Sequence, residues 1–160
     1  MVIFIVTAAV VLALDLLTKY LISSGMELHS SITLIPGVLN FTYIENEGAA
    51  WGFLAGKQIF LQIFTLIVIL AILGYVIKKR ETLKKLELIS LGLIVGGGLG
   101  NFLSRLFEGK VVDFIEFTFS RIFNIFNVAD IGITFGCLFL VISMFLSERS
   151  SKKDGRSEED

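Results

Sequence analysis

Two aspartates, Asp113 and Asp130, are the residues of this sequence whose type and setting are best suited to chemistry. Asp113 lies in the strand-like run VVDFIEF, and Asp130 lies at the start of an apolar stretch. Two carboxyl groups held near each other cannot both stay ionised, so one keeps a proton while the other can take a proton from water. That is the chemistry of aspartic proteases. The spacing alone equally allows a structural role, because Asp130 could simply be an acidic residue at the positive end of a helix dipole.

Other common catalytic arrangements lack their parts in this sequence. His29 is the only histidine and no HExxH segment is present, so we predict no metal site. A serine triad would depend on the same His29, GxSxG is absent, and Ser104 has no general base nearby in the sequence. Cys137 is the only cysteine, which excludes a disulfide or a CxxC redox pair within the chain.

Four further polar residues stand inside apolar segments, where a charge is costly and needs a partner or a function. Asp15 and Lys19 are four residues apart, which places them on one helix face as a structural ion pair. Asn101 and Arg105 repeat that spacing, and the planar guanidinium of Arg105 can hold a carboxylate or a carbonyl oxygen. For Asn101 and Arg105 two interpretations stay open, orientation of the fold and direct contact with a substrate.

The elements that must position these residues are membrane spans. With 54% hydrophobic and 18% charged residues and a mean hydropathy of +0.82, the chain has the composition of an integral membrane protein. Four segments are long enough to cross roughly 30 Å of hydrocarbon as helices: Val2 to Ile22, Ile59 to Ile77, Leu86 to Phe107 and Val128 to Leu146. We expect one membrane domain over residues 1–147 and a polar, disordered cytoplasmic tail over residues 148–160. The net charge of −1 gives no reason to expect nucleic acid as a partner.

The distribution of Lys and Arg predicts the orientation of the spans. Basic residues gather in the second loop and the tail, namely Lys78, Lys79, Arg80, Lys84, Lys85, Arg149, Lys152, Lys153 and Arg156. The positive-inside rule then puts both termini in the cytoplasm and loops one and three outside. The polar residues of the spans, and Asp113 with them, fall at the same outer membrane boundary.

The two outer loops carry strand patterns. ITLIPGVLNFTYIE has β-branched and aromatic residues around a Pro36-Gly37 turn, and VVDFIEF is a second such run. The predicted fold class is therefore a mainly α membrane protein with four transmembrane helices and a small extracytoplasmic β-platform formed by loops one and three. Phenylalanines crowd the third loop, which fits an aromatic belt at the lipid interface or contact with a lipidic ligand.

Five elements in order along the chain resemble the lipoprotein signal peptidase family, also called signal peptidase II. They are DLLTK with Asp15 and Lys19; the stretch NFTYIENEGAAWGFL with Asn46, Gly48, Ala49 and Ala50; GGGLGNFLSR with Gly100, Asn101 and Arg105; VVDFIEF with Asp113; and FNVAD with Asn127, Ala129 and Asp130. The resemblance covers nearly the whole chain. Ser104 departs from it, because the family usually has an aspartate just before the arginine, and Trp51 replaces a commoner phenylalanine.

The resemblance implies a bacterial aspartic endopeptidase of the cytoplasmic (inner) membrane that works without a cofactor, and we expect it to be a monomer. Its substrates would be prolipoproteins, cut at the outer face just before a cysteine that carries a diacylglyceryl group, and membrane lipids would be its other partners. Asp113 and Asp130 match the family's catalytic positions. The remaining matched residues would bind substrate or position the two aspartates: Asn46, Gly48, Ala49, Asn101, Arg105, Asn127 and Ala129.

Two other functions compete with this interpretation. Charged residues inside spans also mark ion pathways, so a small ion- or proton-coupled transporter is the alternative, although its acidic residues should line the whole membrane thickness. A non-catalytic scaffold is the third, with Gly92, Gly96 and Gly100 as a small-residue helix-packing face. A scaffold would leave Asp113 and Asp130 without a purpose.

Overall fold

The computed structural model describes residues 1–48, 57–119 and 125–156, with side chains described as far as residue 146. The elements follow in the order α1 (Val2–Gly25), β1 (Ser31–Ile35), β2 (Leu39–Asn46), α2 (Gln58–Lys79), α3 (Lys85–Glu108), β3 (Val111–Phe117) and α4 (Val128–Arg156). In the described part of the chain four helical segments can cross a membrane, namely α1, α2, α3 and the first part of α4, Val128–Leu146. Together with the small sheet, these spans confirm the predicted fold class.

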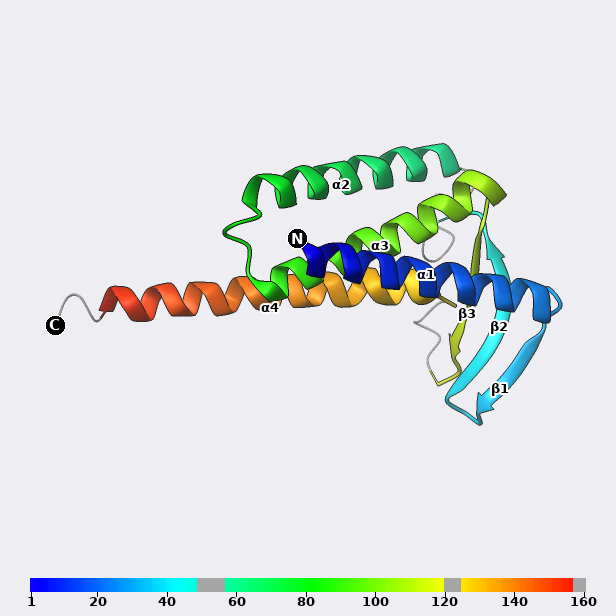
Figure 1. Cartoon of the computed structure of the whole chain (residues 1–160). Helices are drawn as coiled ribbons and strands as arrows, with labels where there is room; N and C mark the ends of the chain where they lie inside the picture. Colours follow the sequence, from blue (N-terminus) through cyan, green and yellow to red (C-terminus); the bar gives the residue numbers. More distant parts are fainter. Residues whose placement is uncertain (49–56, 120–124, 157–160) are drawn as a thin grey trace.

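The helix α3 lies in the middle of the bundle and packs against α1, α2 and α4 (Figure 1). Glycines allow the close approach. A Cβ atom at Gly96 would stand 2.6 Å from the carbonyl oxygen of Ala8 in α1, and one at Gly97 would stand 2.3 Å from the carbonyl oxygen of Ala129 in α4. The glycine run is therefore a helix-packing surface, as its small-residue spacing predicts.

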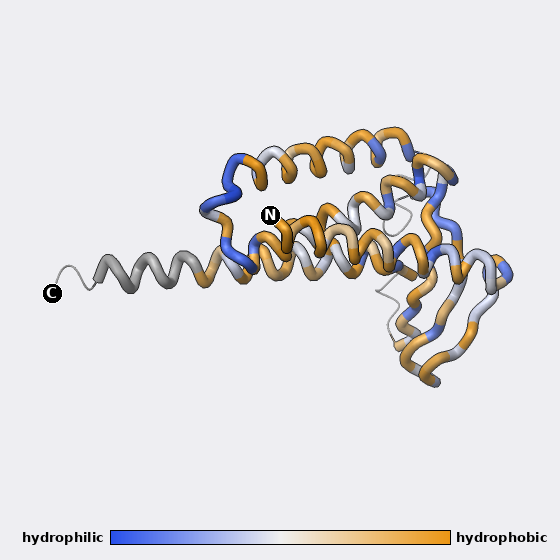
Figure 2. Tube along the Cα trace, viewed as in Figure 1, coloured by the Kyte–Doolittle hydropathy of each residue, from blue (hydrophilic) through white to orange (hydrophobic). Residues whose placement is uncertain are grey.

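The helices bury an apolar core on one side and present apolar side chains outward on the other. The core cluster consists of Phe4, Ile69, Val76, Leu88, Leu91 and Val95. Large apolar side chains such as Ile5, Phe64 and Leu70 stay more than half exposed, and apolar residues cover the length of the spans (Figure 2). Such surfaces are stable against lipid, where no water has to be ordered around them.

The sheet covers one end of the bundle (Figure 1). Its strands are antiparallel in the order β1-β2-β3, with Ile44 of β2 opposite Asp113 of β3. A second apolar cluster, formed by Ile22, Tyr43, Val112 and Phe114, packs the sheet against the end of α1. The platform predicted from loops one and three is thus a single sheet that holds Asp113 above the helix ends.

The helix α4 runs beyond residue 148, where the tail is predicted to begin. It continues past the apolar span as far as Arg156 and projects from the end of the bundle opposite the sheet (Figure 1). The segment after Leu146 contains no proline, and adding residues to an existing helix avoids the costly nucleation step. The helix thus extends beyond the apolar span, and the division into a membrane domain and a disordered tail stays a prediction.

Candidate active site

Asp113 is held at the centre of β3 by two amide donors. Its side chain is 2% exposed, with Oδ2 accepting a hydrogen bond from Asn46 Nδ2 at 2.8 Å and Oδ1 accepting one from Asn127 Nδ2 at 2.6 Å. Burial raises the pKa of Asp113 from 3.8 to about 6, the two amide bonds oppose that rise, and the charge of Asp130 adds to it. A carboxyl group with this pKa exchanges a proton near neutral pH.

Asp130 is held in the first turn of α4 by an exchange of hydrogen bonds with Asn127. The backbone N–H of Asn127 donates to Asp130 Oδ2 at 3.2 Å, and the backbone N–H of Asp130 donates to Asn127 Oδ1 at 3.0 Å. The other carboxyl oxygen, Oδ1, accepts a hydrogen bond from Asn101 Nδ2 at 2.8 Å. The start of α4 and the side chain of Asn101 together fix this carboxyl group.

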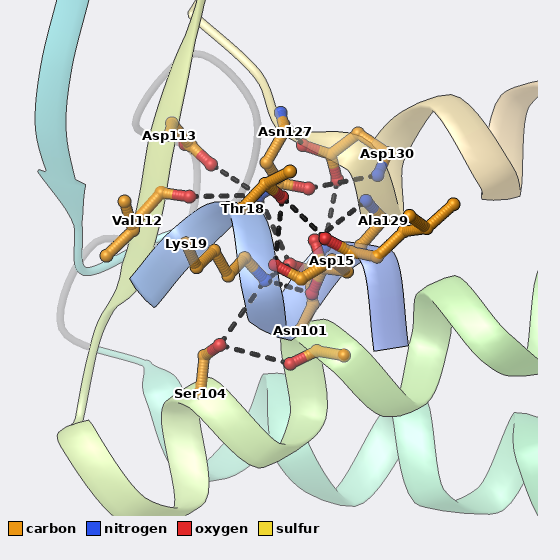
Figure 3. A network of polar contacts seen from close by, with 12 residues as sticks. Asp15, Thr18, Lys19, Asn101, Ser104, Val112, Asp113, Asn127, Ala129 and Asp130 are labelled. Atoms are coloured by element: carbon orange, nitrogen blue, oxygen red, sulfur yellow. Dashed lines mark hydrogen bonds and ion pairs between the residues drawn. The ribbon is translucent and has the colours of Figure 1, made fainter. Parts of the chain in front are cut away.

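Asn127 joins the two aspartates, which lie on either side of it (Figure 3). Its side-chain NH2 donates to Asp113. Its side-chain oxygen accepts a hydrogen bond from the backbone N–H of Asp130, and its own backbone N–H donates to the Asp130 carboxyl group. The structure therefore brings the two sequence-predicted carboxyl groups into one hydrogen-bonded network, with their positions set by a buried asparagine. We call Asp113 and Asp130 the aspartate pair.

The predicted ion pair between Asp15 and Lys19 is present and is connected to this network. Lys19 Nζ lies 2.6 Å from Asp15 Oδ2, and both side chains are buried. The other oxygen of Asp15 accepts a hydrogen bond from the backbone N–H of Ala129 at 2.9 Å. Lys19 also donates to Asn101 Oδ1 at 2.8 Å and to Ser104 Oγ at 3.3 Å. The ion pair thus links α1 to both α3 and α4.

Arg105 fastens the segment that follows β2. Its guanidinium donates to the carbonyl oxygen of Gly48 at 3.0 Å and to that of Asn101 at 3.3 Å. The backbone N–H of Gly48 in turn donates to Asn46 Oδ1 at 2.9 Å, so the amide that binds Asp113 is itself held in place. Ala49, the remaining predicted site residue, lies outside the described residues.

Two contacts at this end of the molecule were not predicted. Gln62 of α2 donates to the carbonyl oxygen of Arg105 at 2.8 Å, and its position as a polar residue early in an apolar span was the available signal. Lys110 pairs with Glu45 at 2.7 Å, and this contact lowers the pKa of Glu45. Among the described residues, no group of His, Cys, Asp and Glu side chains could hold a metal ion.

Comparisons with known proteins agree on one family. The family model for signal peptidase (SPase) II matches residues 7–146. Lipoprotein signal peptidases of Listeria monocytogenes serotype 4a and Listeria innocua serovar 6a are each 39% identical to this chain over 150 residues, which is 93% of this chain and 96% of theirs.

Two solved structures, both described as bacterial membrane enzymes, are similar in fold. One has a TM-score of 0.84 and 38% sequence identity, covering 93% of this chain and 90% of its own. The other has a TM-score of 0.79 and 37% identity, covering 88% and 91%. The match extends over the helices and the sheet that together hold the aspartate pair, and this multi-pass membrane protein belongs to the signal peptidase II family of proteases.

Proposed function

We propose that this protein is an aspartyl endopeptidase that removes the signal peptide from bacterial prolipoproteins, cutting just before a cysteine that carries a diacylglyceryl group. The observation that carries the proposal is the aspartate pair, two carboxyl groups joined by Asn127 at the end of a membrane bundle. The relatives named above are lipoprotein signal peptidases, which supports the same substrate class.

The proposed reaction uses one proton on the aspartate pair. The ionised carboxylate takes a proton from a water molecule as the water oxygen bonds to the scissile carbonyl carbon. The protonated carboxyl group donates its proton to the carbonyl oxygen, which leaves a tetrahedral intermediate. When the C–N bond breaks, the carboxyl group that took the water proton donates it to the departing amine, and the other carboxylate takes back a proton from a hydroxyl of the intermediate, which leaves one proton on the pair as at the start. The raised pKa of Asp113, about 6, supports a pair that holds a proton more readily than an ordinary aspartate does.

Asparagine side chains support this reaction by holding each carboxyl group in one orientation. Asn46 and Asn127 donate to Asp113, and Asn101 donates to Asp130. Fixed donors of this kind cost no reorganisation during the reaction. Arg105 holds the backbone at Gly48, and in this position it is suited to keeping the bound substrate peptide beside the aspartate pair.

We place the site at the outer face of the bacterial cytoplasmic membrane, with both termini inside. The α2–α3 connection, rich in lysine and arginine, lies at the end opposite the sheet (Figure 2), and the positive-inside rule assigns that end to the cytoplasm. A signal peptide that crosses the membrane would then present its outer end to the aspartate pair.

Exposed aromatic side chains beside the site support lipid contact. Phe107 at the end of α3 is 79% exposed, and Phe119 just after β3 is 63% exposed. Phe117 lies next to Phe119, with ring centroids 5.3 Å apart. These rings suit both membrane lipid and the acyl chains of a lipidated cysteine. One chain supplies both carboxyl groups of the aspartate pair and the asparagines that bind them, and we therefore propose activity as a monomer.

A transporter is not supported. In the described part of the chain the buried charged residues of the spans, Asp15 and Lys19, join one network with Asp113 and Asp130 at the sheet end (Figure 3). A proton or ion pathway would need such groups through the whole membrane thickness.

The aspartate pair is tested by Asp113→Asn and Asp130→Asn in the purified protein, with product mass measured after incubation with a diacylglyceryl-modified prolipoprotein. Each should abolish cleavage, and the double variant should be little worse than either single one, because the two groups act as a unit. Glu116→Gln is the matched control, since Glu116 lies on the same strand and contacts Thr42. A folded Asp113→Asn protein that cleaves at the wild-type rate would exclude the aspartyl mechanism.

The substrate class is tested separately by comparing one precursor with and without the diacylglyceryl group. We expect the modified form to be cut far faster, because the acyl chains would contact the aromatic surface beside the site. Equal rates for the two forms would remove lipid from the recognition model while leaving the aspartyl mechanism intact.

A further inference from the structure

The ammonium group of Lys19 does more than neutralise Asp15. An ion pair at positions four apart on α1 would be complete without any other helix. Lys19 instead extends across to α3, where it donates to the side-chain oxygen of Asn101 at 2.8 Å and contacts Ser104 Oγ at 3.3 Å (Figure 3). Its side chain is 6% exposed, so water competes little for these hydrogen bonds.

This contact determines which way the amide of Asn101 faces. An ammonium group has donors only, so the atom of Asn101 that faces Lys19 must be the carbonyl oxygen. The NH2 group then faces the opposite way, toward Asp130, to which it donates at 2.8 Å. The reverse orientation would set NH2 against the ammonium group and the carbonyl oxygen against the carboxylate, which are two repulsive contacts.

The orientation of Asn127 is settled without Lys19. The backbone N–H of Asp130 can only donate, so it fixes the carbonyl oxygen of Asn127 toward α4, and the NH2 group of Asn127 then faces Asp113. Asn127 Nδ2 also lies 3.2 Å from Asn101 Oδ1, a longer contact than the one from Lys19. Among the described residues Lys19 is therefore the stronger donor that orients Asn101.

We propose that Lys19 is a positioning residue for the aspartate pair, acting through the side chain of Asn101 to keep a hydrogen-bond donor on Asp130. The inference rests on the proposed function, because it concerns the same reaction. Without Lys19, the oxygen of Asn101 keeps the longer contact from Asn127, so the amide is held less firmly. Its donation to Asp130 would then be less well fixed, although the contacts of Asp130 with Asn127 remain.

The test must separate orientation from charge, because Lys19→Met alone would leave Asp15 buried and unpaired. The pair variant Asp15→Asn/Lys19→Met removes both charges together. Asn at position 15 keeps an oxygen that can accept the N–H of Ala129. Thr18→Val is the matched control, since Thr18 lies on the same helix and its hydroxyl donates to the carbonyl oxygens of Leu14 and Asp15 in that helix.

We expect the Asp15→Asn/Lys19→Met variant to fold, with kcat reduced about tenfold to a hundredfold and KM little changed. A loss of this size is what a misplaced catalytic group costs. The decisive measurement repeats the pair change in an Asn101→Ala background. If Lys19 acts through Asn101, the pair change should then lower kcat no further. Thr18→Val should keep the wild-type kcat.

Three outcomes would overturn the proposal. The first is a folded pair variant with wild-type kcat, and the second is an equal loss of kcat with and without Asn101. The third is a pair variant that folds neither in detergent nor in isolated membranes, which would make Asp15 and Lys19 a folding requirement only. Asp113→Asn in the same preparation separates these results from failure of the proposed function, because a cleaving Asp113→Asn protein refutes the aspartyl mechanism itself.

Discussion

The neighbouring glycines Gly97 and Gly98 offer a sharp test of how the bundle holds the site. A Cβ at Gly97 would lie 2.3 Å from the carbonyl oxygen of Ala129, whereas one at Gly98 would lie 3.5 Å from the nearest atom, in Ile69. The first distance is about 1 Å too short for contact between non-bonded atoms. Gly97→Ala should therefore push α3 and α4 apart by about that amount, while Gly98→Ala fits without movement.

The displacement has a direct consequence for the aspartate pair. Asn101 lies one turn after Gly97, and its bond to Asp130 spans the same interface at 2.8 Å. Moving the helices apart by about 1 Å would stretch this bond beyond hydrogen-bonding range. A misplacement of that size costs about a hundredfold in rate. Overpacking costs about 1–3 kcal/mol, which the helix preference of alanine offsets by about 0.5–1 kcal/mol.

The assay compares thermal unfolding and cleavage of lipidated precursor for the two variants. Gly97→Ala should lose about 1–2 kcal/mol of stability and about a hundredfold in kcat. Gly98→Ala should gain about 0.5–1 kcal/mol and keep the wild-type kcat. If the two variants behave alike in both measurements, close contact at Gly97 does not position Asn101 and the reasoning fails.

The remaining predictions concern pH, topology and the ion pair. The pKa of Asp113 is about 6 in the folded protein, against 3.8 for an aspartate in the unfolded chain. The stability that this group contributes is therefore fully present below about pH 4 and is lost as the pH rises through 6. The loss is on the order of 3 kcal/mol in the free energy of unfolding. It should be absent from Asp113→Asn, and the same pH dependence of unfolding in both proteins would contradict this. In intact cells without the native cysteine, Cys introduced at Ser31 should react with an impermeant thiol reagent and Cys at Thr82 should not; the reverse pattern would invert the topology. Asp15→Asn alone should lower stability by about 3–5 kcal/mol by leaving Lys19 buried and unpaired, which the yield of folded protein would reveal.

Sequence reasoning succeeded where the property is local and additive. Span length and hydropathy can be summed along the chain, so the four helices followed from composition. The ion pair of Asp15 and Lys19 followed from their spacing on one helix. Asp113 and Asp130 were singled out by elimination and by the resemblance, and their catalytic roles stay a prediction.

Only the tertiary structure decided how these residues meet. Whether Asn127 or Asn101 faces a given carboxyl group depends on the rotation of each helix about its own axis, which hydropathy does not specify. The reach of Lys19 across to α3 depends in turn on how closely glycines let the backbones approach. These contacts change with displacements of less than 1 Å, while span assignment tolerates shifts of several residues. The sequence by itself therefore determined the membrane class, the spans and the polar residues within them, and tertiary packing decided the hydrogen-bond network that joins those residues into one site.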